Sequence, residues 1–158
     1  MATEKQITKL EKKYGLTVVY YPTWATRLLK LIKRDGVVID LNKYMLIDFE
    51  TAESSSVKSL EATFVHEKVH ETRIPDNIFG LVLWYLNYFF SRKFRFEEEA
   101  RAYYAEMVFI SGGKQPKIEL MKAFASVMQS DVYRAFWEKE PMCTIDQAVE
   151  RFKQLHKG

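Results

Sequence analysis

The 158-residue chain has little of what several classes of protein need. Its single cysteine, Cys143, cannot close an intramolecular disulfide or build a cysteine-based zinc cluster. Six glycines and four prolines exclude collagen-like and linker-like material. The first residues are charged and lack the apolar core of a signal peptide. Because neither an export signal nor a disulfide framework is recognisable, we expect a reducing, cytoplasmic compartment.

Long apolar runs and concentrated positive charge are also missing. The longest apolar-rich run, residues 78–90, is interrupted by Gly80 and Asn87 and is shorter than the roughly 20 residues of a membrane-spanning helix. We therefore predict no membrane span and interpret the run as a buried helix. The 24 Lys and Arg residues are balanced by 21 Asp and Glu residues, which argues against a dedicated nucleic-acid binder.

The sequence has the composition of one folded domain. A hydrophobic content of 47% excludes a disordered chain, and the length suits a single domain over residues 1–158. The first third predicts a helix capped by Thr3, a strand at 16–21, a helix after Thr23 and a hairpin with arms at 37–41 and 44–49. Everything after Glu50 predicts helices. We expect an α+β fold in which a small N-terminal antiparallel sheet packs on a mainly helical body.

The chemically informative segment is His66-Glu67-Lys68-Val69-His70, inside a helix expected over about residues 54–72. Residues four apart lie about one helical turn apart, so both imidazoles project from one face and can bind the same ion. Zinc accepts neutral imidazole nitrogens in a tetrahedral set that leaves one position for water. Glu67 lies about 100° around the helix from His66. That position suits a base that accepts a proton from water during metal-assisted peptide hydrolysis.

A catalytic zinc ion normally has three protein ligands, so a third ligand must come from another part of the chain. His156 lies near the end of a predicted C-terminal helix, where we expect it to face solvent. The cluster Glu97-Glu98-Glu99 opens a helix expected over about residues 96–110, where acidic side chains also suit the positive end of the helix dipole. The helical wheel directs Glu98 toward solvent and leaves both Glu97 and Glu99 as candidate ligands.

These two motifs resemble those of the gluzincins, the zincin metallopeptidases whose third zinc ligand is a glutamate. The closer resemblance is to small phage- and bacterium-encoded members, in which an aromatic-rich helix and then a segment of the type E-x-E-A-x-x-Y follow the motif helix. Here that segment reads Glu97-Glu98-Glu99-Ala100-Arg101-Ala102-Tyr103. The resemblance covers about residues 44–107 and implies Glu99 as the third ligand. Many larger gluzincins carry an aspartate at the position of Tyr103.

The resemblance implies a zincin-like fold with an active-site helix and zinc-dependent hydrolysis of a polypeptide substrate. In that reading His66, His70 and Glu99 bind Zn²⁺, and Glu67 acts as the general base. A peptidase also needs a donor for the developing oxyanion. The sequence does not choose among four side chains that are chemically capable of this: Tyr103, Tyr104, Tyr133 and His156.

Aromatic and basic residues concentrated over residues 84–95, from Trp84 to Arg95, support a second hypothesis. We interpret the aromatic residues mainly as helix packing, and alternatively as one wall of a cleft for apolar substrate side chains. The rival function is a non-catalytic, zincin-like module that docks a protein or nucleic acid through this region. Chelator-sensitive cleavage of unfolded polypeptides by the zinc-loaded protein would distinguish the enzyme from the module.

Overall fold

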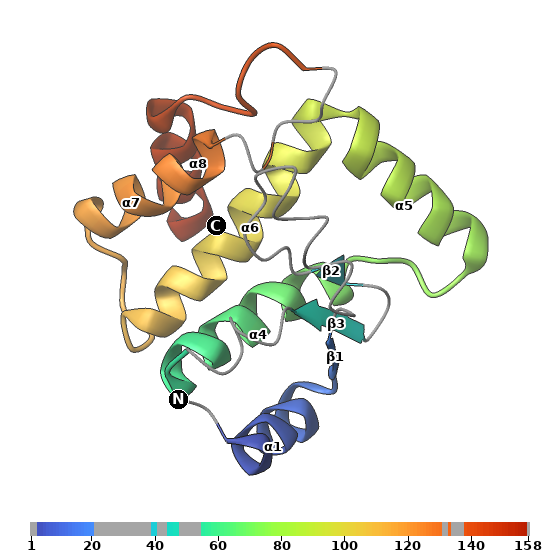
Figure 1. The fold of residues 1–158 in the computed structure, drawn as a ribbon. Coiled ribbons are helices and arrows are strands. Elements are labelled where there is room, and N and C mark those ends of the chain that lie inside the picture. The colour runs from blue at the N-terminus through green and yellow to red at the C-terminus, as the bar shows by residue number, and fades with distance from the viewer. Residues whose placement is uncertain are drawn as a thin grey trace. The chain divides into compact units, whose positions relative to one another are not determined.

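The computed structural model describes residues 3–20, 39–40, 44–47, 55–130, 133 and 138–157 (Figure 1). The predicted helix after Thr23 lies outside these residues, as does most of the first hairpin arm. The chain divides into two compact units, Met1–Glu71 and Thr72–Gly158. The single domain expected over residues 1–158 stays a prediction.

The first unit combines two helices with a small sheet. Helix α1 begins after Thr3, whose hydroxyl accepts the N–H of Gln6 while the Gln6 side chain accepts the N–H of Thr3, which confirms the predicted cap. It ends at Gly15, which has the left-handed conformation with φ of 68°. The elements of this unit in chain order are α1 Glu4–Tyr14, β1 Thr17–Tyr20, β2 Ile39–Asp40, β3 Tyr44–Ile47 and α4 Val57–Glu71.

The sheet is mixed, with strand order β1-β3-β2. Strands β2 and β3 pair antiparallel, with Ile39 opposite Leu46, which confirms the pairing predicted for the two hairpin arms; the predicted turn lies outside the described residues. Strand β1 runs parallel to β3, with Thr17 opposite Tyr44, so the prediction of a wholly antiparallel sheet is wrong. A hairpin follows from a local turn, whereas parallel neighbours need a connection of about a dozen residues or more. Residues 21–43 provide that length between β1 and β3.

Helix α1 and the sheet hold α4, the helix that carries the histidine motif. The Lys13 ammonium and the Tyr14 hydroxyl both donate to the carboxylate of Glu61 on α4, at 2.6 and 3.1 Å. A shared hydrophobic core lies beneath these polar contacts. Its buried residues are Ile7, Leu10, Leu16, Met45, Leu60 and Phe64.

The second unit is entirely helical over its described elements, which are α5 Ile78–Phe90, α6 Arg92–Ile110, α7 Ile118–Gln129 and α8 Ile145–Lys157. Helices α6, α7 and α8 pack together around a core that includes the fully buried Met107, Ala125 and Phe152 (Figure 1). The predicted mainly helical body is therefore confirmed. Among the described segments, none forms a helix with both the length and the apolarity that crossing a membrane requires.

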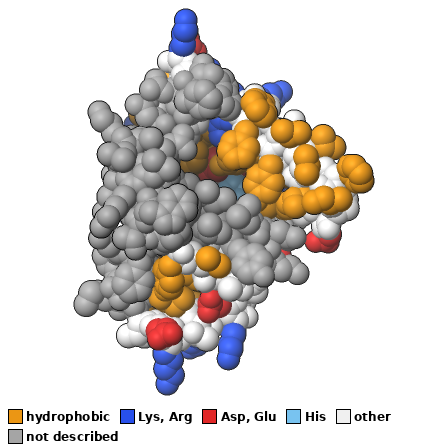
Figure 2. Space-filling model, turned by 45° about the vertical axis from the view of Figure 1, so that its right-hand side comes forward, with side chains coloured by type: hydrophobic (Ala, Val, Ile, Leu, Met, Phe, Trp, Pro, Cys, Tyr) orange, Lys and Arg blue, Asp and Glu red, His pale blue; other side chains and the backbone are white. Residues whose placement is uncertain are grey.

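Helix α5 is exposed, so its prediction as a buried helix is wrong. None of its residues is buried, and Phe79 is 80% exposed. Figure 2 shows hydrophobic side chains gathered over this helix. Apolar composition predicted burial, but the core of the second unit is filled by side chains of α6, α7 and α8. Helix α5 contacts α6 through Trp84, whose ring meets the edge of Phe94, and through Tyr88, whose hydroxyl bonds to Glu99.

A single residue, Ser91, separates α5 from α6. Its hydroxyl accepts the N–H of Phe94 at 3.3 Å and so caps the start of α6. The predicted start near residue 96 is therefore too late, because the basic residues expected in a connector form the first turn of the helix. The Arg95 guanidinium donates to the carbonyls of Tyr88 and Phe89 at 2.8 and 3.1 Å, which satisfies acceptors at the end of α5.

Candidate metal centre

The two histidines of the motif lie on successive turns of α4. His66 and His70 are both buried, and their Nε2 atoms are 3.3 Å apart. Two nitrogens that each lie about 2.0–2.1 Å from a tetrahedral zinc ion would be about 3.3 Å apart. The pair therefore has the spacing of two ligands on one ion.

The local sequence explains why α4 turns this face inward. The Ser56 hydroxyl accepts the N–H of Ser59 at 3.1 Å and so caps the start of the helix. Ala62 and Glu67 are buried together with the histidines. Lys68 lies on a more exposed side and pairs with Glu71 at 2.5 Å. The motif carboxylate of Glu67 thus lies within the protein, beside His66 in the chain.

Glu98 does not face solvent as predicted; it is 1% exposed. The Arg73 Nε donates to both of its carboxylate oxygens, at 2.9 and 2.7 Å, and Arg101 donates at 3.2 Å. A buried carboxylate is tolerated when cations compensate its charge. The wheel considered only the apolar residues of one helix, and therefore missed the cation that Arg73 contributes from the segment between α4 and α5.

Glu97 is a partner for arginines at the unit's surface. Arg151 on α8 donates to its Oε2 through Nε and Nη2, at 3.0 and 2.7 Å, and Arg101 lies 3.4 Å from the same oxygen. The Glu97 side chain is 28% exposed. Glu97 therefore joins α6 to α8 through its ion pair with Arg151.

Glu99 has different surroundings from its two neighbours. It is 2% exposed, and its Oε1 accepts a hydrogen bond from the Tyr88 hydroxyl of α5. The carboxylate also acts on Tyr133: burial raises the pKa of that phenol well above its usual value, and the charge of Glu99 raises it further. Of the two carboxylates that periodicity left open, Glu99 is therefore the buried one, surrounded by phenols instead of arginines.

Tyr88 is a residue that the sequence reasoning missed. It belongs to an aromatic run that we interpreted as packing, and nothing in the local pattern distinguishes it from Tyr85 or Phe89. Its hydrogen bond to Glu99 depends on how α5 folds back on α6 after Ser91. No sequence signal within one helix could have identified that contact.

The four candidates for oxyanion stabilisation separate into two pairs. The hydroxyls of Tyr103 and Tyr133 hydrogen-bond each other, and Tyr133 is the phenol that Glu99 influences. The Tyr104 hydroxyl instead bonds to Nδ1 of His156 at 2.7 Å. His156 is exposed, as predicted. The first pair is thus the one associated with the candidate ligand.

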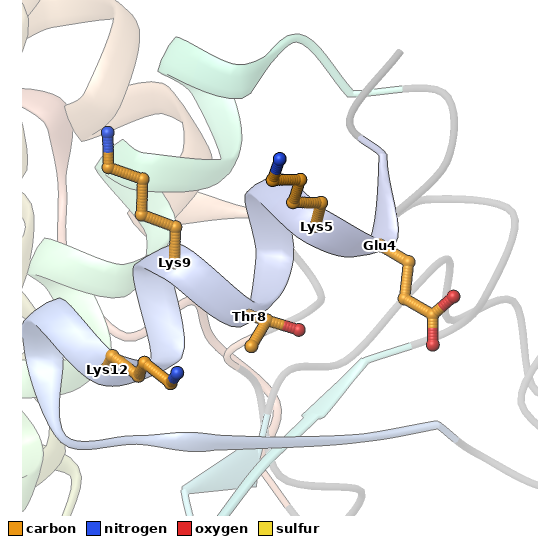
Figure 3. A pocket seen from close by; sticks show the side chains of 5 residues that line it. All are labelled: Glu4, Lys5, Thr8, Lys9 and Lys12. Carbon is orange, nitrogen blue, oxygen red and sulfur yellow. The ribbon is translucent and has the colours of Figure 1, made fainter.

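A depression along α1 is a further surface feature of the first unit. Its lining residues are Glu4, Lys5, Thr8, Lys9 and Lys12. Figure 3 shows that their charged ends point in different directions and do not converge on a common point. We assign no binding function to it.

Comparisons with known protein families, with curated proteins and with solved structures found no match to this chain. The resemblance to gluzincins therefore stays a prediction from two motifs. The function has to be inferred from the chemistry of the residues themselves.

Proposed function

We propose that the protein is a zinc-dependent metallopeptidase of zincin-like fold in which His66, His70 and Glu99 bind the ion. The observation that carries the proposal is the 3.3 Å separation of the two buried imidazole Nε2 atoms on α4. The donor set supports it as well. These three buried side chains form a group that could hold a metal ion, because each offers one ligand atom. Two imidazoles and a carboxylate occur in catalytic zinc sites, which keep a further position open.

The proposed reaction is hydrolysis of a peptide bond in a polypeptide substrate. A bound zinc ion would supply a Lewis acid that lowers the pKa of water to about 7. Glu67 would accept one proton from the attacking water, whose oxygen bonds to the carbonyl carbon. As the C–N bond breaks, Glu67 would return that proton to the leaving amine nitrogen. His66 and His70 would hold the ion near the Glu67 carboxylate, because all three side chains belong to α4.

The test compares zinc content and hydrolysis of an unfolded polypeptide in matched variants. We expect about one zinc ion per wild-type chain and chelator-sensitive cleavage. Glu67→Gln should retain zinc and lose about 10²–10⁴-fold in rate, because an amide cannot accept the proton. Full activity in Glu67→Gln would contradict the mechanism, and a wild-type chain that binds no zinc would contradict the proposal.

The acidic cluster provides a matched control for the third ligand. Glu99→Ala should weaken zinc binding, because it removes one of three ligands. Glu97→Ala should retain it, because that carboxylate already pairs with Arg151 and Arg101. If Glu97→Ala lost zinc and Glu99→Ala kept it, Glu97 and not Glu99 would be the third ligand.

The exposed apolar surface of α5 favours a second candidate, a module that docks a polypeptide. Phe79 and Leu83 are 80% and 59% exposed, which is unusual for large apolar side chains. The basic residues that follow at the start of α6 give less support to a nucleic-acid partner. Arg95 is buried against Glu138 at 2.6 Å, and Arg92 pairs with Glu140 at 3.4 Å. Zinc-loaded protein that captures an unfolded polypeptide without cleaving it, and loses capture on Phe79→Ser, would favour the module.

A further inference from the structure

We propose that Tyr88 is a positioning residue that fixes the orientation of the Glu99 carboxylate for metal binding; this inference rests on the proposed metal site. The Tyr88 hydroxyl donates to Oε1 of Glu99. A hydrogen bond to a carboxylate is stronger than one between neutral groups and is directional. The contact therefore restricts the orientation of the Glu99 carboxylate by holding its Oε1 against Tyr88.

Tyr88 can do this because its own ring is held from the side. The ring stacks on Trp84, with centroids 5.2 Å apart and planes 12° from parallel. Trp84 in turn meets the edge of Phe94 on α6, at 5.8 Å. The stack connects the phenol to the first turn of the helix that carries Glu99. The hydroxyl and the carboxylate are thus placed by the same pair of helices.

The backbone of Tyr88 is held by a second set of contacts. Its carbonyl accepts a hydrogen bond from Arg95 Nη1 at 2.8 Å. The same guanidinium is buried, and its Nη2 donates to both carboxylate oxygens of Glu138 at 2.6 Å. Arg95 therefore cannot turn away without breaking a buried ion pair, which is costly. These contacts hold the end of α5 in place even though most of the helix is exposed.

A held hydroxyl matters because a glutamate side chain has several rotatable bonds. Without an orienting partner, part of the affinity for an ion would be lost in ordering the carboxylate. Hydrogen bonds to metal ligands restrict them in advance, and removing such a partner typically weakens metal binding about 10–100-fold. Tyr88 has this role because its hydroxyl bonds to Glu99, whereas the hydroxyls of Tyr103 and Tyr133 bond to each other.

The experiment compares Tyr88→Phe with Tyr104→Phe in the full chain. Both changes remove one phenol oxygen, but Tyr104 bonds to His156 and not to the candidate ligand. Zinc affinity is measured by competition with a chromophoric chelator, and ligand geometry by the visible absorption of the Co²⁺-loaded protein. We expect Tyr88→Phe to bind zinc about 10–100-fold more weakly and to change the cobalt spectrum. Tyr104→Phe should match the wild type in both.

A double-mutant cycle separates orientation from general destabilisation. In a Glu99→Gln background, removing the Tyr88 hydroxyl should change zinc affinity little further, because the two residues act through one contact. Wild-type affinity and spectrum in Tyr88→Phe would overturn the inference and leave the proposed function standing, as would an equal loss in both backgrounds. A wild-type chain that binds no metal would instead overturn the proposed function as well.

Discussion

At the scale of single residues, the buried polar side chains carry most of the functional information, because burying such groups is costly unless partners compensate. Arg95 and Glu98 have this compensation from ion pairs with Glu138 and Arg73, so their burial is explained by structure alone. Among the residues that the structure describes, the other buried polar side chains are those to which we assign the chemistry: His66, Glu67, His70 and Glu99, the last of which accepts a hydrogen bond from Tyr88.

The single cysteine should be unreactive in the folded protein. Cys143 is buried, and burial raises the pKa of its thiol to about 11, while Arg92 lowers it slightly. The thiolate is the nucleophile, and at about pH 8 its fraction would be about a hundredfold smaller than for an ordinary thiol. We expect a chromogenic disulfide reagent to react with Cys143 at least about a hundredfold more slowly in the native than in the unfolded chain.

The control for this prediction is the pH dependence. Reaction of the native protein should accelerate as the pH rises toward the pKa of the thiol. Equal rates in native and unfolded protein near pH 8 would contradict the burial of Cys143.

At the scale of elements, α5 and α8 show that apolar content alone does not determine burial. Helix α8 mixes charged and apolar residues, yet Ala148 and Phe152 are fully buried between its neighbours. Helix α5 contains no charged residue, yet none of its side chains is buried. An amphipathic pattern indicates which face turns inward, whereas a uniformly apolar helix gives no such direction.

This difference in burial predicts that a change of phenylalanine to alanine lowers the free energy of unfolding more in α8 than in α5. Phe152→Ala should lower the free energy of unfolding by about 3–5 kcal/mol, because it removes a fully buried ring and leaves a cavity. Phe79→Ala should change it by no more than about 0.5 kcal/mol, because the ring is 80% exposed. Chemical denaturation followed by circular dichroism measures both. A cost above about 2 kcal/mol for Phe79→Ala would mean that α5 is covered in solution.

At the scale of the whole molecule, the proposed metal site would couple zinc binding to folding. Its three proposed ligands, His66, His70 and Glu99, are spread over more than thirty positions of the sequence, and such a ligand set rarely exists in an unfolded chain. A ligand that binds only the folded protein stabilises it by mass action.

We expect zinc to raise the midpoint of thermal unfolding and a chelator to reverse the effect. At a free zinc concentration of about 100 times Kd, the stabilisation would be about 2.7 kcal/mol. Calorimetry with and without zinc measures the shift, and Glu99→Ala serves as the control that should reduce it. An unchanged midpoint in the presence of excess zinc would contradict the proposed site.

The sequence by itself determined features that depend on residues a few positions apart. The Thr3–Gln6 cap, the left-handed Gly15 and the antiparallel pairing of β2 with β3 were all predictable, because each forms within one short segment. The spacing of His66 and His70 is of the same kind, since one helical turn brings their nitrogens to 3.3 Å.

Only the tertiary structure decided features that depend on distant segments. Strand β1 pairs parallel with β3, which is far from it in the sequence, and Glu98 is buried because Arg73 from outside its helix compensates its charge. The exposure of α5 and the bond from Tyr88 to Glu99 likewise depend on how helices pack. Packing partners depend on how the shapes of side chains far apart in the sequence fit together, and a local sequence pattern does not determine that fit.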